Sequence, residues 1–319
     1  MIIGGFMNTI DIIVPCFNEE EVLPLFIKEV NEVISEIRKY HFKYIFIDDG
    51  SKDKTLAIIK EFALNSQDVK YISFSRNFGK EAAMYAGLKN STADYAIVMD
   101  ADLQPPPKMF HEMIKAIEEG FDCCALYRTK RKGESVFRRF FSKIFFSFQK
   151  RISHIDMPEG AVDYRIMTKK MENAVLKLAE GQRFSKGIFC WVGFNTKWIE
   201  YKNIERPIGK AKWSLMGLCK YAIDGIMSFS VFPLRIIAIT GFIISLFSFI
   251  YIMVTIIQTL IFGIVVPGYV TTLCATLFLG GIIELSVGVL GEYIGRIYIE
   301  VKHRPIYIAA ETNIEVENK

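Results

Sequence analysis

The chain has 319 residues, of which 51% are hydrophobic and 23% charged, and its formal net charge is +4. A positive mean hydropathy of +0.25 beside that charge content predicts a soluble part joined to a membrane part. The mild net charge and the lack of a long basic run argue against nucleic acid as a partner. The scattered cysteines predict reduced thiols in a cytosolic setting, and residues 1–7 do not resemble a signal peptide.

Apolar runs typical of strands alternate with helical patterns between residues 10 and 127. Strands are predicted at 10–14, 44–47, 70–74, 95–99 and 122–127. Helices are predicted at 21–40, 55–64, 80–89 and 108–119. Strands that alternate with single helices indicate right-handed βαβ units, so we expect an α/β fold with a mainly parallel sheet.

Three of the predicted strands end in polar, turn-forming clusters. These are residues 15–19 (Pro-Cys-Phe-Asn-Glu), 48–51 (Asp-Asp-Gly-Ser) and 100–102 (Asp-Ala-Asp). Parallel strands would bring all three clusters to one edge of the sheet, where open α/β sheets bind their ligands. The sequence has no dinucleotide fingerprint after the first strand and no P-loop pattern. A phosphate-containing ligand would therefore be held by a metal ion and by side chains.

The acid pair Asp100 and Asp102 follows four apolar residues directly. Alternation along a strand would put both carboxylates on one side, where their charges repel unless a cation lies between them. Oxygen ligands favour Mg²⁺ or Mn²⁺, so the pair predicts such an ion. The triple proline at 105–107 is predicted to stop the strand from continuing. The alternative is a solvated turn, in which Asp-x-Asp is common.

Residues 128–151 combine many Arg and Lys residues with repeated Phe. A helix that is basic on one side and rich in Phe on the other suits an anionic membrane surface. The alternative is an ordinary amphipathic helix packed on the sheet, with its basic face in water.

Residues 236–295 contain no Lys or Arg and predict two transmembrane helices, at about 236–262 and 269–290. Basic residues flank both outer ends, which places these ends on the cytoplasmic side. Glu284 is interpreted as a protonated carboxyl that faces another helix, with a helix-pairing or oligomer contact as the alternative. Formation of a homo-oligomer stays open, because Gly291 and Gly295 have small-x-x-x-small spacing.

These patterns divide the chain into five segments. They are an N-terminal extension (1–8), the α/β domain (9–212), an interfacial juxtamembrane helix (213–235), the two spans (236–295) and a cytoplasmic juxtamembrane segment with a tail (296–319). Residues 311–319 are polar and are predicted to be disordered.

Motifs at the predicted sheet edge resemble those of the inverting, family-2 glycosyltransferases with a GT-A fold. They are Val14–Glu20, Asp48–Thr55, Arg76–Ala83 and Asp100–Pro106. Matches at Arg128–Arg131, Asp163–Arg165, Gly181–Phe184 and Arg206–Trp213, with the two spans, extend the resemblance over essentially the whole chain. Within the family the chain resembles polyprenyl-phosphate glycosyltransferases, bactoprenol glucosyltransferases most and dolichyl-phosphate mannose synthases more distantly. The resemblance implies a cytoplasmic, Rossmann-like GT-A catalytic domain anchored in a bacterial inner membrane.

The resemblance also implies which residues bind the nucleotide-sugar donor, a UDP-sugar. The nucleoside would be held by Pro15, Phe17, Glu19 and Asp49. The metal ion on the donor diphosphate, Mg²⁺ or Mn²⁺, would be held by Asp100, Asp102 and Gln104. Positive charge at the diphosphate would come from Lys80, Arg206 and Lys212.

The acceptor implied by the resemblance is a polyprenyl phosphate in the bilayer. Its phosphate would be clamped by Arg128, Arg131 and Arg138, since guanidinium groups form forked hydrogen bonds with phosphate. A phosphate oxygen would attack the anomeric carbon from the face opposite UDP. A phosphate monoester is largely deprotonated at neutral pH, so no strong general base is required.

Asp163 lies where the family keeps an acid near the reaction centre, and we expect it to orient the sugar or the acceptor. Asp102, Arg128 and Arg131 complete the expected catalytic set. The alternative for Asp163 is an ion pair with Arg165 that holds the strand.

Single-sugar transfer is favoured over polymerisation, because Arg183 follows Gln182 directly, unlike the Gln-x-x-Arg-Trp motif of processive synthases, and only two spans are predicted. The expected donor is UDP-glucose. The alternatives are UDP-N-acetylhexosamine, UDP-galactose, GDP-mannose or a modified pentose donor, a diacylglycerol acceptor, or a catalytically silent membrane scaffold.

Overall fold

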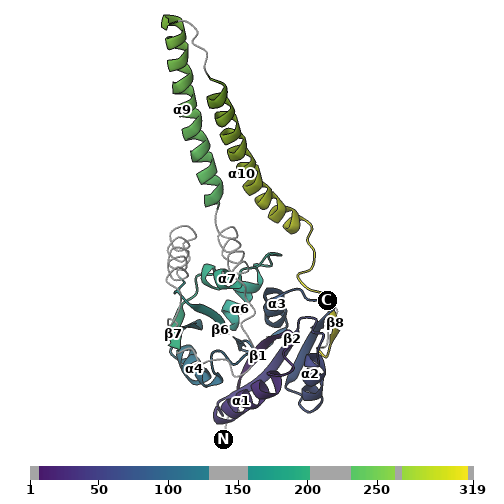
Figure 1. Ribbon diagram of the computed structural model, residues 1–319. Coiled ribbons are helices and arrows are strands. Elements are labelled where there is room, and N and C mark those ends of the chain that lie inside the picture. Colours follow the sequence, from purple (N-terminus) through teal and green to yellow (C-terminus); the bar gives the residue numbers. More distant parts are fainter. Residues whose placement is uncertain (1–6, 129–156, 202–230, 263–267, 315–319) are drawn as a thin grey trace. The chain divides into compact units, whose positions relative to one another are not determined.

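The computed structural model describes residues 7–128, 157–201, 231–262 and 268–314 (Figure 1). The chain forms two compact units, an α/β unit (Met1–Ala222 with Pro305–Lys319) and a helical unit (Ile223–Arg304). Several predictions fall outside the described residues. They concern Arg131, Arg138, Arg206, Lys212, the basic and Phe-rich helix, and most of the interfacial segment 213–235.

The α/β unit is built on one sheet, which has eight strands in the part of the chain that is described. The strands are β1 (Asn8–Cys16), β2 (Tyr40–Asp48), β3 (Val69–Phe74), β4 (Tyr95–Val98), β5 (Cys123–Arg128), β6 (Ala161–Thr168), β7 (Thr196–Tyr201) and β8 (Ala309–Thr312). Their order is β7-β5-β6-β4-β1-β2-β3-β8. Strand β1 pairs in parallel with β2 and β4, β2 with β3, and β5 with β7. The prediction of a mainly parallel α/β sheet is confirmed.

Two strands run against the others. Strand β6 lies between β4 and β5 and is antiparallel to both, and β8 is antiparallel to β3. The prediction that the tail is disordered from residue 311 is wrong for Glu311, Thr312 and Asn313. Their backbone and side chains bond to β3, whose outer edge would otherwise lack a partner.

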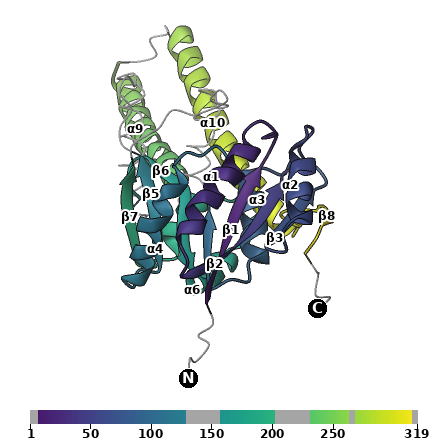
Figure 2. The same cartoon turned by 90° about the horizontal axis from the view of Figure 1, so that it is seen from below.

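Helices cover both faces of the sheet (Figures 1 and 2). They are α1 (Leu23–Glu36), α2 (Thr55–Leu64), α3 (Lys80–Asn90), α4 (Phe110–Glu118), α6 (Lys169–Leu176) and α7 (Ser185–Trp191), with a 3₁₀ turn η1 (Pro107–Met109) before α4. Alternate residues of β1, such as Ile12 and Val14, join the core that contains Phe26 of α1 and Phe110 of α4. The predicted helix 21–40 ends early, because Tyr40 belongs to β2 and packs edge-on against Tyr95.

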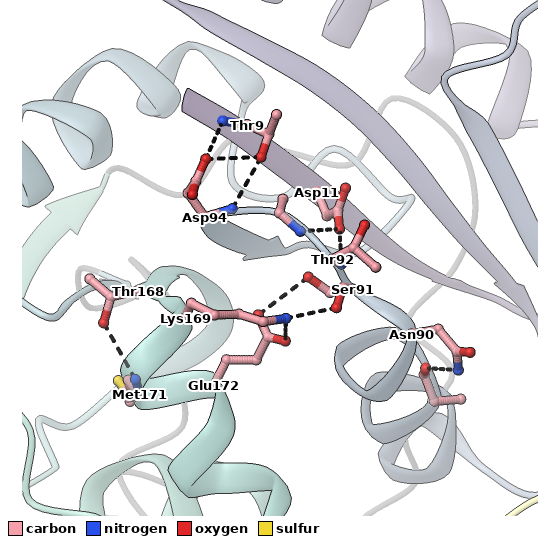
Figure 3. Close-up of polar contacts among 12 residues, drawn as sticks. Thr9, Asp11, Asn90, Ser91, Thr92, Asp94, Thr168, Lys169, Met171 and Glu172 are labelled. Carbon is pink, nitrogen blue, oxygen red and sulfur yellow. Dashed lines mark hydrogen bonds and ion pairs between the residues drawn. The ribbon is translucent and has the colours of Figure 1, made fainter. Parts of the chain in front are cut away.

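A set of polar contacts lies at the amino ends of β1 and β4 (Figure 3). We call it the amino-edge network; it consists of Thr9, Asp11, Ser91, Asp94, Lys169 and Glu172. Buried Asp11 accepts hydrogen bonds from the amides of Thr92 and Ala93, at 2.8 and 3.1 Å. Lys169 Nζ lies 2.6 Å from Glu172 Oε1 and 2.7 Å from the Ser91 carbonyl. Thr9 and Asp94 exchange hydrogen bonds in both directions.

The helical unit consists of α9 (Phe232–Phe262) and α10 (Tyr269–Val301). Both helices contain stretches long and apolar enough to cross a membrane, Pro233–Phe262 and Phe278–Val301. Large apolar side chains are exposed along them, for example Phe242 and Leu260 on α9 and Phe278 and Leu285 on α10. The predicted pair of apolar helices is therefore confirmed, and α10 continues beyond the predicted span to Val301, as expected if residues 297–301 carry the helix out of the bilayer.

Candidate active site

The acid pair lies on a loop rather than on the strand. The β4 ladder ends at Val98, and the Met99 amide donates a last bond to the Ile13 carbonyl at 3.1 Å. The prolines therefore do not end this strand, contrary to the prediction. Burial still alternates along the loop: Met99, Ala101 and Leu103 are in the core. The intervening polar residues, Asp100, Asp102 and Gln104, are partly exposed.

Lys80 joins the acid loop to β6. Its ammonium nitrogen lies 2.8 Å from the Asp100 carboxylate and 2.6 Å from Asp163 Oδ2. The exposed fractions of the three side chains are 39% for Lys80, 36% for Asp100 and 12% for Asp163. One cation thus neutralises two acids that lie far apart in the sequence, at a place that solvent still reaches.

The antiparallel direction of β6 explains how Asp163 reaches this place. Strand β6 is in register with β4, with Val98 opposite Arg165. Continuing that register by two residues brings Asp163 level with Asp100. Two carboxylates at that spacing repel each other unless a cation lies between them, and Lys80 fills this position.

Lys80 and Asp163 hold each other in the charged state. Burial alone would raise the pKa of Asp163, but the charges of Lys80 and Lys186 and the hydrogen bond from Lys80 hold it well below its usual range. Burial by itself would lower the pKa of Lys80, but the charges and hydrogen bonds of Asp100 and Asp163 raise it above its usual value. Asp163 Oδ1 is buried and has no hydrogen-bond partner among the described residues.

The alternative reading of Asp163, an ion pair with Arg165, is wrong. The Arg165 guanidinium donates to the main-chain carbonyls of Asp163 and Val162, at 3.3 and 3.2 Å. It also lies over the Phe189 ring, 3.9 Å from the centroid. Arg165 is 1% exposed and therefore braces the backbone of β6, which leaves the Asp163 carboxylate to Lys80.

Asp49 fixes the loop that leads into Lys80. Its Oδ1 accepts from the Phe78 amide at 2.6 Å, and its Oδ2 accepts from the Gly79 amide at 2.9 Å. Gly79 has φ +96° and directly precedes α3, a conformation that favours glycine. A Cβ on Gly50 would lie 2.6 Å from the Arg76 carbonyl carbon, so the loop packs directly on the turn after β2. Burial raises the pKa of Asp49, against the opposing effect of the two amides.

The turn after β1 is tied to the turn after β2. The Asn18 amide donates to Ser51 Oγ at 3.0 Å, and the Lys52 amide donates to Asn18 Oδ1 at 2.9 Å. The Glu19 amide donates to Thr55 Oγ1 at 2.8 Å. Phe17, the residue after β1, is 37% exposed. An exposed aromatic side chain is a suitable surface for stacking a base.

The strand order places the predicted site residues in a row along the carboxyl edge of the sheet. In the order of the sheet, Arg128 ends β5, Asp163 lies in β6, Asp100 follows β4, Pro15 lies near the end of β1 and Asp49 follows β2. Asp102 and Gln104 follow Asp100 on the same loop, where the Gln104 amide donates to Asp102 Oδ1 at 3.1 Å.

Three charged residues near the site had no role in the sequence analysis. Glu81 follows Lys80 and accepts from the Ser185 amide at 2.9 Å, and Arg183 lies over the Tyr85 ring, 4.7 Å from the centroid. Lys186 contributes to the low pKa of Asp163. Two of the family motifs carried a signal: Arg76–Ala83 contains Glu81, and Gly181–Phe184 contains Arg183 and directly precedes α7.

Comparisons with known proteins agree with this architecture. Residues 11–176 match the model of Glycosyl transferase family 2, and residues 232–297 match that of the GtrB C-terminal hairpin. The bactoprenol glucosyl transferase of Shigella phage SfV is 42% identical over 299 residues, covering 94% of this chain and 97% of that protein. The prophage bactoprenol glucosyl transferase homolog of Escherichia coli (strain K12) is 41% identical over 299 residues, with coverage of 94% and 97%.

Among solved structures, glucosyl-3-phosphoglycerate synthase from Mycobacterium tuberculosis, in complex with Mn²⁺, UDP-glucose and phosphoglyceric acid, is a more distant match. Its TM-score is 0.48 at 14% identity, over 70% of this chain and 78% of that chain.

Proposed function

This chain belongs to glycosyl transferase family 2, and on that premise we propose that it transfers one hexose from a nucleotide sugar to a polyprenyl phosphate. The donor we propose is UDP-glucose and the acceptor is undecaprenyl phosphate. Support comes from the relatives named bactoprenol glucosyl transferase, which are 42% and 41% identical over nearly the whole chain. The product would be a lipid-phosphate-linked glucose with an inverted anomeric centre.

The observation that carries the proposal is the bridge from Lys80 to Asp100 and Asp163 at the carboxyl edge. It lies in the middle of the row of predicted residues, between Arg128 of β5 and the turns after β1 and β2. This order supports an acceptor phosphate bound towards β5, a nucleoside bound towards β2, and a reaction centre between them.

Asp100, Asp102 and Gln104 fit a hard divalent cation, Mg²⁺ or Mn²⁺. They offer only oxygen ligands, and the alternating burial of their loop leaves all three partly exposed. The described residues contain no group of three or more His, Cys, Asp or Glu that could hold a metal. Diphosphate oxygens and water would therefore complete the coordination, as is usual for Mg²⁺. Such an ion supplies positive charge to the leaving diphosphate when it is bound.

Asp163 would orient the substrates rather than remove a proton. A carboxylate whose pKa lies well below its usual range is a weak base. Its Oδ2 holds the Lys80 ammonium at 2.6 Å, so Asp163 would orient the substrates through Lys80. The lipid phosphate, with a second pKa of about 6, would already be the nucleophile at neutral pH.

We place the α/β unit in the cytoplasm, with α9 and α10 spanning the bacterial inner membrane. Arg235 lies near the start of α9, and Lys302 and Arg304 follow the last turns of α10. Positive residues at both outer ends of a short hairpin favour the cytoplasmic side for those ends.

The test uses the purified full-length protein in detergent, radiolabelled UDP-glucose, Mn²⁺ and undecaprenyl phosphate. We expect label to pass into an organic-extractable product that needs both the lipid phosphate and the metal. Parallel reactions with UDP-galactose, UDP-N-acetylglucosamine and GDP-mannose identify the preferred sugar. Failure to transfer from every donor would refute the proposal.

Asp102→Asn is the matched variant for the metal assignment. It removes one anionic ligand while keeping the size of the side chain, so we expect the folded protein to lose at least about 100-fold in kcat/KM. Unchanged activity at saturating Mn²⁺ would exclude Asp102 as a ligand.

A further inference from the structure

The chain beyond the apolar hairpin returns to the α/β unit. We call residues 305–314 the return segment. Its strand β8 pairs with β3, the Ser75 amide donates to the Ile308 carbonyl at 3.0 Å, and Asn313 Oδ1 accepts from the Tyr71 amide at 2.7 Å. Glu311 adds an ion pair of 2.6 Å with Lys60. The return segment is therefore held along its length by specific contacts with the edge of the sheet.

Tyr307 connects this segment to the loop before Lys80. Its ring stacks on Phe74, with centroids 4.9 Å apart and planes 22° apart. Phe74 in turn meets the Phe78 ring edge-on at 5.7 Å, and the Arg76 guanidinium lies over the Phe78 ring, 4.0 Å from its centroid. Phe74 is 3% exposed, and Tyr307 is one of the two rings packed against it.

The loop at residues 75–79 thus has two anchors. One anchor is Asp49, which binds the amides of Phe78 and Gly79. The other is the aromatic stack that begins with Tyr307 and ends at the Phe78 ring. Lys80 is the first residue of α3 after this loop, so both anchors restrict where its ammonium can lie.

We propose that Tyr307 is a positioning residue for Lys80, acting through Phe74 and Phe78. The inference rests on the proposed role of Lys80 in the transferase site. It assigns to the chain beyond the hairpin a part in building the active site, because only residues 302–306 separate Val301 of α10 from Tyr307. A loop anchored only at Asp49 would let Lys80 move relative to Asp100 and Asp163, and small displacements of a charged group lower the rate strongly.

The test compares three variants of the full-length protein. Tyr307→Ala removes the stack; Tyr307→Phe keeps it and loses only the hydroxyl, which accepts from Asn90 Nδ2 at 3.3 Å. Glu311→Gln is the matched control. It weakens β8 at the bonds with Lys60 and Tyr71 and leaves the Phe74 stack intact. Hydrogen exchange of the Phe78 and Gly79 amides, the melting temperature and the kinetics are measured for each.

We expect Tyr307→Ala to speed exchange of the two amides by about 10-fold and to lower kcat/KM for the nucleotide sugar by about 10-fold. Tyr307→Phe should stay within about two-fold of the parent in both, since the stack remains. Glu311→Gln should lower the melting temperature without changing exchange at these amides or kcat/KM of the folded protein.

Unchanged exchange in Tyr307→Ala would overturn the inference. The inference would also be overturned if the losses of kcat/KM in Tyr307→Ala and Glu311→Gln simply followed the losses of melting temperature. The return segment would then act only through the stability of the protein. Faster exchange in a protein that transfers no sugar would refute the proposed function while supporting the positioning of the loop by Tyr307.

Discussion

The two edges of the same sheet use similar charged groups in opposite ways. At the amino edge, Lys169 neutralises Glu172, whose side chain is 0% exposed, and both Glu172 oxygens are within hydrogen-bond distance of a described donor. At the carboxyl edge, Lys80 neutralises Asp100 and Asp163 where Asp100 is 36% exposed. There, Asp163 Oδ1 has no partner among the described residues.

The difference separates a structural use of charge from a functional one. In the amino-edge network the Glu172 carboxylate is 0% exposed and both of its oxygens are bonded within the protein, so a ligand would have to break existing bonds to reach it (Figure 3). The carboxyl edge keeps partly exposed charges on Lys80 and Asp100, which an incoming substrate could contact without disrupting the fold. The exposure of these charges, rather than their number, supports the proposal that the carboxyl edge is the active edge.

The largest expected contrast comes from removing each lysine in turn. Lys80→Ala should lower kcat/KM by at least about 100-fold, because the charge is proposed to act at the reaction centre. Lys169→Ala should leave the activity of the folded protein within about three-fold but cost about 2 kcal/mol in free energy of unfolding, since Glu172 loses its counterion. Steady-state kinetics and denaturant unfolding check both. If Lys80→Ala and Lys169→Ala lost the same activity at the same folded fraction, the proposed division into a functional carboxyl edge and a structural amino edge would be contradicted.

A smaller effect, equal across the neutral pH range, is expected from Asp163→Asn. The pKa of Asp163 is lowered, so its charge is present above its usual value of 3.8 and is lost only on further acidification. The pKa of Lys80 is raised, so its charge is lost only above its usual value of 10.5. We expect the Asp163→Asn variant to lose about 30-fold in kcat/KM at every pH from about 5 to about 9.

The pH profile of the parent protein provides the check on this expectation. Any acidic limb near pH 6 should persist in Asp163→Asn, because it would report the lipid phosphate. A limb that disappears in Asp163→Asn would show that Asp163 titrates near neutrality and acts as a base.

The smallest expected effect concerns Glu172, and it changes stability alone. Burial raises the pKa of Glu172 from 4.5 to about 6. A raised pKa favours the protonated form in the folded state, so the contribution of Glu172 to stability falls as the pH rises from 4.5 through about 6. Glu172→Gln should therefore gain about 1 to 2 kcal/mol relative to the parent between pH 4.5 and pH 7. Unfolding curves across this range test it, with exposed Glu32→Gln as the control.

The sequence predicted the parallel part of the fold well, because local patterns decide it. Strands β1 to β4 and the helices between them follow from short apolar runs and helical spacing, and α2 matches the prediction at both ends. The predicted end of α1 was wrong, since the Tyr40 ring fits a helical pattern as well as the strand in which it packs on Tyr95.

The antiparallel strands could not be predicted, because long-range pairing decides them. Nothing local in Ala161–Thr168 indicates that it inserts between β4 and β5. The approach of Asp163 to Asp100 was therefore accessible only through resemblance to a family. Asp49 shows the same limit: its position at a strand end was predicted, but its bonds to Phe78 and Gly79 depend on a loop from a different βα unit.

Strand β8 also bears on how truncated forms of the chain should behave in solution. A fragment that ends at Ala222 to avoid the apolar helices also lacks residues 305–314, which would leave β3 with a row of unpaired amide and carbonyl groups along one side. Exposed edges of this kind template pairing with another molecule, so such a fragment is a candidate for aggregation even though every helix that covers its sheet is present. A soluble version of the α/β unit would need residues 305–314 rejoined to it through a linker in place of the hairpin.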